Sequence, residues 1–289
     1  MPIPLRDAMR EILDGWEQDL APAWRGLLVG APLGFEDIAS ELMLEPWEPV
    51  FPARKGRIFP GAPKGAHIFR AFEGISLERV RCLILGQDPY PCPAFATGRA
   101  FEAGNVALWR EFEKMFSHSM RTLLQLIVVA RTGDETYGRS VLEWPRLITD
   151  IEAGRVTLPK PAEIADSWVA QGVLLLNSSL TLSRFAVEGD PHQLRGHLPL
   201  WRPLVIAVVR ALMARAQPLV IIGFGAQAAE VLRACDIAQV ADGRVAGHGA
   251  VACLPREHPA RGDALLAQPN PFQACNRLLA SMNATPIAW

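Results

Sequence analysis

The stretch GQDPY places an amide, a carboxylate and a phenol directly after an apolar run. Gln87, Asp88 and Tyr90 follow residues 81–86, whose sequence RCLILG is typical of a strand buried on both faces. An aspartate before a proline is common in turns, so this stretch alone favours a structural explanation. A carboxylate at a strand end can also hold a water or offset positive charge, so other residues must decide between the two.

Three further apolar runs have the same character: 172–177 (GVLLLN), 218–223 (PLVIIG) and 250–255 (AVACLP). Helical spacing of apolar residues predicts helices over 119–131, 199–216, 226–235 and 270–282. Pro203 is expected in the first turn of the second helix, and Asn270 as the cap of the last. Strands that alternate with helices predict an α/β fold, a three-layer α/β/α sandwich around a central four-stranded, mostly parallel sheet.

Polar side chains follow the ends of these predicted strands. Ligands of open parallel sheets bind beyond the carboxyl ends of the strands. Asp88 follows the first run and Asn177 ends the second, while a glycine-rich turn follows the third and His258 follows the fourth. Each residue alone has an ordinary structural explanation, but all of them at one sheet edge favour a binding site.

The turn after the third run also supports a competing interpretation. GFGAQA, residues 223–228, fits the dinucleotide pattern G-x-G-x-x-A, and Asp242 lies about twenty residues beyond its first glycine. That pattern normally follows the first strand of a nucleotide-binding unit. Here only one strand-like run remains after it, which disfavours nicotinamide or flavin binding.

An aspartate, an asparagine and a histidine around an apolar slot suit cleavage of an N-glycosidic bond. Asparagine offers a donor and an acceptor that can pair with an imide edge. Histidine can stabilise an anion that develops on a leaving base, and aspartate can hold a water and offset oxocarbenium charge.

These residues lie in motifs that resemble those of family 1 uracil-DNA glycosylases. GQDPY is similar to that family's water-activating motif, and ATGRAF keeps the spacing to its base-stacking phenylalanine. WVAQGVLLLNSSLT resembles its uracil-reading strand, and IFP…FRAF resembles the segment before GQDPY. HP at 258–259, followed by NPFQACNRLL, resembles the last loop and helix. The resemblance extends from residue 24 to residue 279.

The resemblance implies an enzyme that flips deoxyuridine out of DNA, hydrolyses the N-glycosidic bond and leaves an abasic site for base excision repair. It assigns water orientation to Asp88. It assigns hydrogen bonding of the leaving uracil to His258 as a neutral imidazole. No metal or other cofactor is implied, and the protein is expected to be a monomer that acts on single- or double-stranded DNA containing uracil.

Further positions carry over from the same motifs. Phe101 would stack on uracil, Asn177 would pair with its imide edge, and Tyr90 would exclude the methyl group of thymine. Gln87 would line the pocket. The positions expected to contact DNA are Pro89, Ser119, Gly225, Ala226, Pro259 and Arg261.

The last loop departs from the family pattern. It reads HPARGD where the family has HPSPLS, so Ala260 replaces a phosphate-binding serine and Gly262 replaces a leucine that wedges into the duplex. Arg261 could fill the gap in the base stack, as could Leu265 or Leu266 in a rearranged loop. The alternative that no wedge exists stays open.

Three more departures concern the turns around the site. Pro91 replaces the histidine of GQDPYH, which removes a side-chain hydrogen bond and fixes the backbone. FSHSMRTL replaces a proline-rich loop and keeps only Ser119. Gly225–Ala226 replaces a glycine–serine pair, and its exposed amides suit a DNA phosphate, which explains GFGAQA without a dinucleotide.

These departures predict changes in substrate choice. With fewer phosphate-binding hydroxyls and no leucine wedge, the enzyme is expected to depend on basic side chains and to favour single-stranded or mispaired uracil. The phage-encoded protein inhibitor of the family grips the leucine loop, so it is expected to bind weakly or not at all.

Two alternatives to uracil excision remain. One is a branch of the superfamily that acts on other damaged bases, which Tyr90 and Asn177 disfavour. The other is a catalytically silent uracil- or DNA-binding module, which the presence of Asp88 and His258 disfavours, because binding needs neither.

Composition bounds the rest of the interpretation. Half of the 289 residues are hydrophobic, and the net charge is −1. This length and composition predict one domain. The domain is expected to have an N-terminal helical extension (1–23) and a long insertion (132–161) that carries a short helix. Basic stretches at 53–72 and 192–202 could bind phosphate. Five scattered cysteines without a CxxC pair predict reduced thiols and argue against a metal or iron–sulfur site. The N-terminus does not resemble a signal peptide and no apolar run approaches about 20 residues, so a cytoplasmic protein without a membrane segment is expected.

Overall fold

A five-stranded sheet forms the centre of the computed structural model, which describes residues 1–57, 59–114, 118–184, 189–237 and 243–289. The strand order is β4 (Val173–Asn177), β3 (Cys82–Gly86), β5 (Leu219–Phe224), β7 (Val251–Arg256) and β6 (Gly243–Arg244). The first four strands are parallel and are the four predicted from the sequence. β6 is a two-residue antiparallel edge strand that was not predicted, because two residues carry no periodicity.

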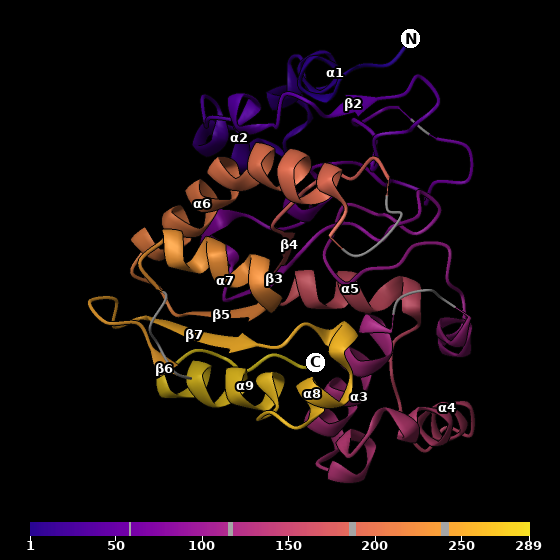
Figure 1. Ribbon diagram of the computed structural model, residues 1–289. Coiled ribbons are helices and arrows are strands. Elements are labelled where there is room, and N and C mark those ends of the chain that lie inside the picture. Colours follow the sequence, from indigo (N-terminus) through magenta and orange to yellow (C-terminus); the bar gives the residue numbers. More distant parts are fainter. Residues whose placement is uncertain (58, 115–117, 185–188, 238–242) are drawn as a thin grey trace.

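Helices cover both faces of the sheet. In Figure 1, α6 (Leu198–Ala214) and α7 (Gly225–Ala234) lie above the sheet, and α9 (Pro271–Ser281) and α3 (Ser119–Thr132) lie below it. Every residue of β3, β4 and β5 is buried, as their continuous apolar sequences require. The three-layer α/β/α sandwich is therefore confirmed, with five strands in place of four.

The predictions for Asn270 and for Pro203 had different outcomes. The side chain of Asn270 accepts hydrogen bonds from the amides of Phe272 (2.9 Å) and Gln273 (3.3 Å), so the predicted cap of α9 is confirmed. The placement of Pro203 in a first turn is wrong, because α6 begins at Leu198, directly after a π-helical turn at Gln193–His197, and Pro203 lies inside α6. Pro199 lies in the first turn of α6 instead.

One helical segment among the described residues, Gln193–Ala214, is long and apolar enough to cross a membrane by length and composition alone. More than half of its apolar stretch is buried inside the protein. Such burial is typical of a helix that packs in the core of a folded domain.

The remaining elements surround this sandwich. The N-terminal part packs onto the same core, since Leu5, Met9 and Trp24 are fully buried and the indole of Trp24 donates to the carbonyl of Ile75 at 2.7 Å. Residues 132–161 contain the short helix expected there, preceded by two 3-10 turns. The strands and α-helices not yet named are β1 (Ile3–Pro4), α1 (Leu5–Ile12), α2 (Pro22–Leu28), β2 (Met43–Leu44), α4 (Trp144–Glu152), α5 (Pro161–Ala170) and α8 (Asp263–Leu266).

Candidate active site

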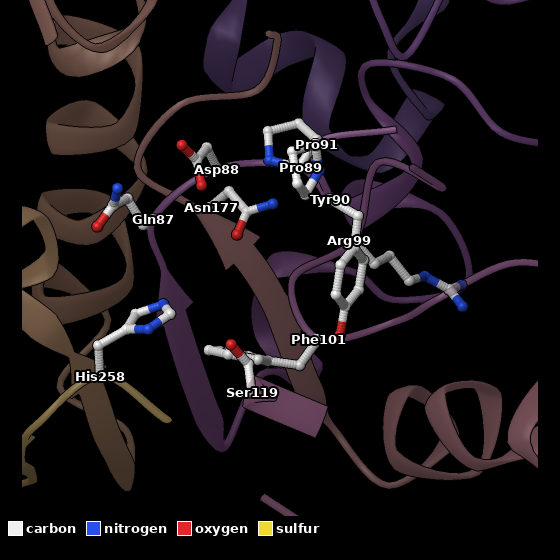
Figure 2. A pocket seen from close by; sticks show the side chains of 10 residues that line it. All are labelled: Gln87, Asp88, Pro89, Tyr90, Pro91, Arg99, Phe101, Ser119, Asn177 and His258. Carbon is white, nitrogen blue, oxygen red and sulfur yellow. The ribbon is translucent and has the colours of Figure 1, made fainter. Parts of the chain in front are cut away.

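A small cavity opens where the carboxyl ends of β3 and β4 meet the loop after β7 (Figure 2). Its volume is about 70 Å³, well below the roughly 300–1,000 Å³ of pockets for drug-sized ligands. Eight predicted site residues line it, together with Pro91 and Arg99: Gln87, Asp88, Pro89, Tyr90, Phe101, Ser119, Asn177 and His258. Residues up to 171 positions apart in the chain, from Gln87 to His258, therefore meet at one cavity.

The β3–β4 pair fixes the centre of the cavity. Gly86 pairs with Asn177 in the parallel register, and a Cβ at Gly86 would lie 2.6 Å from Oδ1 of Asn177. Only glycine therefore leaves room for the asparagine side chain. The turn after β4 is tied to β3, since the amide and the hydroxyl of Ser178 donate to the carbonyl of Gly86 (3.0 and 2.8 Å) and the amide of Ser179 donates to that of Gln87 (2.8 Å).

Asn177 presents its amide group to the cavity. The residue is only 3% exposed, and Figure 2 shows its side chain between Asp88, Tyr90 and His258. Within the described part of the chain, no residue is hydrogen-bonded to this amide. Its donor and acceptor are therefore available to a ligand in the cavity.

Asp88 is a carboxyl group in a desolvated position. Its Oδ2 atom is buried and has no hydrogen-bond partner among the described residues. Burial raises the pKa of Asp88 from its ordinary value near 3.8 to about 7, and the Gln87 side chain acts in the opposite direction. A perturbed carboxyl group in a cleft is a candidate for acid–base or charge-stabilising work near neutral pH.

His258 lies at the start of the turn after β7 with its ring directed toward Asn177 (Figure 2). Its Nδ1 atom accepts a hydrogen bond from the amide of Ala260 at 3.2 Å. A nitrogen that accepts carries no proton, so the neutral ring carries its proton on Nε2 and is a donor there. Gly225, with φ +82°, permits the close packing of this ring, since a Cβ there would lie 3.0 Å from Cβ of His258.

Two aromatic side chains complete the wall. Phe101 has a left-handed backbone (φ 55°), which is strained for a bulky residue, and its ring packs edge-on against Phe224 at 5.3 Å. The ring centroid of Phe101 lies 6.3 Å from that of His258. The hydroxyl of Tyr90 is buried without a partner in the described ranges, and burial raises the pKa of Tyr90 above its usual range, so the phenol is neutral.

Pro91 and Arg99 also line the cavity, although neither was predicted as a binding residue. The Arg99 guanidinium points away from the cavity in Figure 2 and pairs with Asp166 (2.6 Å) and Glu102 (3.2 Å). Its charge therefore serves the packing of the ATGRAF turn. In the sequence, the charge of Arg99 within ATGRAF is the signal that points to this role.

The predicted DNA-contacting residues lie in and around the cavity. Pro89 and Ser119 line it, and Gly225 and Ala226 begin α7 beside His258. Pro259 is buried and Arg261 is 68% exposed, with Nε 3.5 Å from a carboxylate oxygen of Glu257.

Two sequence-based alternatives have little support in the structure, and a third cannot be placed. Leu265 is fully buried in α8 and Leu266 is partly buried against the core, so neither side chain projects as a wedge in this arrangement of the loop, and a wedge from a rearranged loop stays a prediction. Asp242 of the dinucleotide pattern lies outside the described residues. Among the residues that are described, no three His, Cys, Asp or Glu side chains are grouped to hold a metal ion, and the five cysteines form no disulfide bond.

Comparison with known proteins gives a consistent picture. No protein-family model matches the chain. A uracil-DNA glycosylase of Mycolicibacterium vanbaalenii is 31% identical over 229 residues, which cover 78% of this chain and 80% of that protein. A uracil-DNA glycosylase of Corynebacterium efficiens is 29% identical over 272 residues, 93% of this chain and 89% of that protein.

Solved structures support the same fold. The UNG structure of Nitratifractor salsuginis matches with a TM-score of 0.58 and 20% identity, covering 96% of both chains. The mimivirus uracil-DNA glycosylase matches with a TM-score of 0.60 and 18% identity, covering 98% of this chain and 92% of that one. Together with the extent of the sequence match to the mycobacterial relative, these findings show that the chain belongs to the uracil-DNA glycosylase family.

Proposed function

We propose that this protein excises uracil from DNA by hydrolysing the N-glycosidic bond, which leaves an abasic site and initiates base excision repair. The observation that carries the proposal is the arrangement of Asn177, His258 and Asp88 around one small cavity. The unpartnered amide of Asn177 suits an imide edge, and the Nε2–H donor of His258 suits a carbonyl oxygen. A base reaches such a cavity only when it is flipped out of the stack.

Binding of the flipped base uses the cavity walls. Phe101 offers an aromatic face that its packing on Phe224 holds in place. Asn177 pairs with the imide edge of uracil, and Gln87 lines the entrance beside Asp88. Tyr90 fills the side of the cavity with a neutral ring, which supports steric exclusion of the thymine methyl group.

Bond cleavage then needs charge stabilisation at both ends of the breaking bond. The electron pair of the C1′–N1 bond goes to uracil, and His258 donates a hydrogen bond from Nε2 to the carbonyl oxygen on which the negative charge develops. The Asp88 carboxylate offsets the positive charge on the sugar and orients a water, which adds to C1′ and passes its proton to that carboxylate while uracil leaves as the anion. These steps use only side chains and water.

The rim of the cavity supports DNA contacts by Pro89, Ser119, Gly225, Ala226, Pro259 and Arg261. We propose that the enzyme acts as a cytoplasmic monomer without a metal or other cofactor, and that it cuts single-stranded or mispaired uracil faster than uracil paired with adenine. Gly262 in place of an apolar side chain supports weak or absent binding of the phage-encoded inhibitor. Cleavage of U·A faster than the other substrates, or a tight stoichiometric block by that inhibitor, would contradict these two points.

The first test is alkali-sensitive cleavage of a labelled single-stranded oligonucleotide with one uracil, in EDTA. The wild type should yield abasic product, and Asp88→Asn and Asn177→Ala should both be sharply impaired while their thermal unfolding shows a folded protein. No product from the wild type, with uracil-DNA still bound, would support a silent recognition module instead. Release of other damaged bases in preference to uracil would support another branch of the superfamily.

A further inference from the structure

Residues 132–161 return along α3 toward the cavity. The helix ends at Thr132, and the side-chain amide of Gln125 then donates to the carbonyls of Tyr137 and Ser140, both at 2.8 Å. A Cβ at Gly138 would lie 3.1 Å from a methyl of Val129. The chain therefore runs back beside α3, from its last turn toward its first.

The returning segment reaches the loop that carries His258. The amide of Val141 donates to Oδ1 of Asp263 at 2.8 Å. A Cβ at Gly262 would lie 2.9 Å from Cγ1 of Val141, in a left-handed backbone with φ +51°. The space that a side chain at position 262 would need is thus occupied by residue 141, which belongs to a different part of the chain.

The next residue, Leu142, is 83% exposed. It lines a surface hollow together with His118 and Arg121 from the start of α3, and His118 directly precedes Ser119, which lines the catalytic cavity. Arg121 is hydrogen-bonded to His118, and in the described part of the chain no ion pair joins it to a carboxylate, although Glu113 lines the same hollow. A single exposed leucine needs no explanation in general. This one lies between two elements that border the cavity, beside a cation that is available to a phosphate.

We propose that Leu142 is the apolar residue that enters the base stack when uracil is flipped out, and that Arg121 contacts the neighbouring phosphate. Side chains such as leucine hold unstacked base steps apart in other DNA-bending proteins. At Leu142 the insertion thereby supplies the apolar side chain that the last loop lacks at Gly262. This inference rests on the proposed function, because a wedge is useful only beside a flipped base.

The test compares one variant on three substrates. Leu142→Ala should reduce single-turnover cleavage of U·A duplex by roughly tenfold or more, reduce U·G cleavage less, and leave single-stranded uracil within about twofold of wild type. Leu142→Phe should restore duplex cleavage, because it restores an apolar side chain. Leu27→Ala is the matched control and should change none of these rates, since Leu27 is also an exposed leucine but lies in α2, which Figure 1 shows on the opposite side of the sheet from α3.

A second readout does not depend on catalysis. Duplex DNA with 2-aminopurine next to uracil should gain fluorescence when bound by Asp88→Asn, and this gain should fall when Leu142→Ala is added. Equal effects of Leu142→Ala on single and double strands, or no effect on either readout, would overturn the inference. A selective duplex defect in Arg261→Ala instead would assign the wedge to Arg261. If the wild type released no uracil from any strand, the proposed function would fail, and the fluorescence alone would then decide the role of Leu142.

Discussion

The Nδ1 atom of His258 accepts a hydrogen bond from the amide of Ala260, two residues further along the same turn. This bond fixes the neutral tautomer that presents Nε2–H to the cavity. We expect nitrogen NMR of the folded protein at neutral pH to show a protonated Nε2 and an unprotonated Nδ1 at His258. The reverse tautomer, or a doubly protonated ring, would contradict the assigned donor role.

Removal of the Nε2–H donor of His258 should destabilise the transition state more than the enzyme–substrate complex. His258→Ala is expected to lower kcat by roughly 10²–10³ with little change in KM, which is the usual cost of losing one donor to a developing anion. Single-turnover cleavage of a single-stranded uracil substrate measures the effect. A loss confined to KM would show that His258 binds substrate without stabilising the leaving group.

The raised pKa of Asp88 predicts the pH dependence of the reaction. The group must be ionised to offset positive charge on the sugar, and its pKa is about 7. We therefore expect kcat/KM to fall about tenfold per pH unit below pH 7 and to level off above it. Single-turnover rates between about pH 5 and 9 measure the profile, and an apparent pKa near the ordinary carboxyl value would contradict the desolvation seen at Oδ2.

The same pKa shift predicts that Asp88 destabilises the folded protein at neutral and higher pH. Between about pH 4 and 7 the folded protein keeps a proton on Asp88 that the unfolded chain releases, so the free energy of unfolding falls as pH rises through this window. Asp88→Asn removes that dependence. The variant should therefore be more stable than wild type near pH 8, by on the order of 1–3 kcal/mol, and equal to it near pH 4.

Urea unfolding at the two pH values measures this difference. Asp14→Asn is the control, because Asp14 is an exposed aspartate and its replacement should alter stability by less than about 0.5 kcal/mol at either pH. An Asp88→Asn variant that is less stable than wild type near pH 8 would show that the ionised carboxylate has a stabilising partner in the folded protein.

Local sequence signals predicted the parts of the fold that local physics determines. The four parallel strands follow from continuous apolar runs, and the cap of α9 follows from Asn270 before a proline. The meeting of Asp88, Asn177 and His258 follows from the rule that parallel strands end at one sheet edge. No local sequence pattern predicts the contact between Val141 and Asp263, which joins residues 122 positions apart. The raised pKa of Asp88 and the left-handed backbone of Phe101 likewise arise from packing by distant segments.

Gly86 should be needed for the position of Asn177. A Cβ at residue 86 would lie 2.6 Å from Oδ1 of Asn177 and 3.2 Å from the Phe101 ring, so Gly86→Ala must displace one or both. We expect a loss of activity similar to that of Asn177→Ala and a decrease in stability of about 1–3 kcal/mol from overpacking. Gly26→Ala, where a Cβ meets nothing within 4 Å, should keep full activity. An active Gly86→Ala enzyme would show that the side-chain position of Asn177 is not limiting.

The ring of Tyr90 should exclude thymine because it occupies the space that the 5-methyl group needs. The ring lines the cavity, and its buried hydroxyl has no hydrogen-bond partner among the described residues. Tyr90→Ala is expected to gain measurable release of thymine from a single-stranded oligonucleotide, because the space for a 5-methyl group opens. Tyr90→Phe keeps the ring and should still reject thymine. Alkali-sensitive cleavage of substrates with a single thymine or a single uracil measures both, and thymine release by Tyr90→Phe would show that the hydroxyl, not the ring, excludes the methyl group.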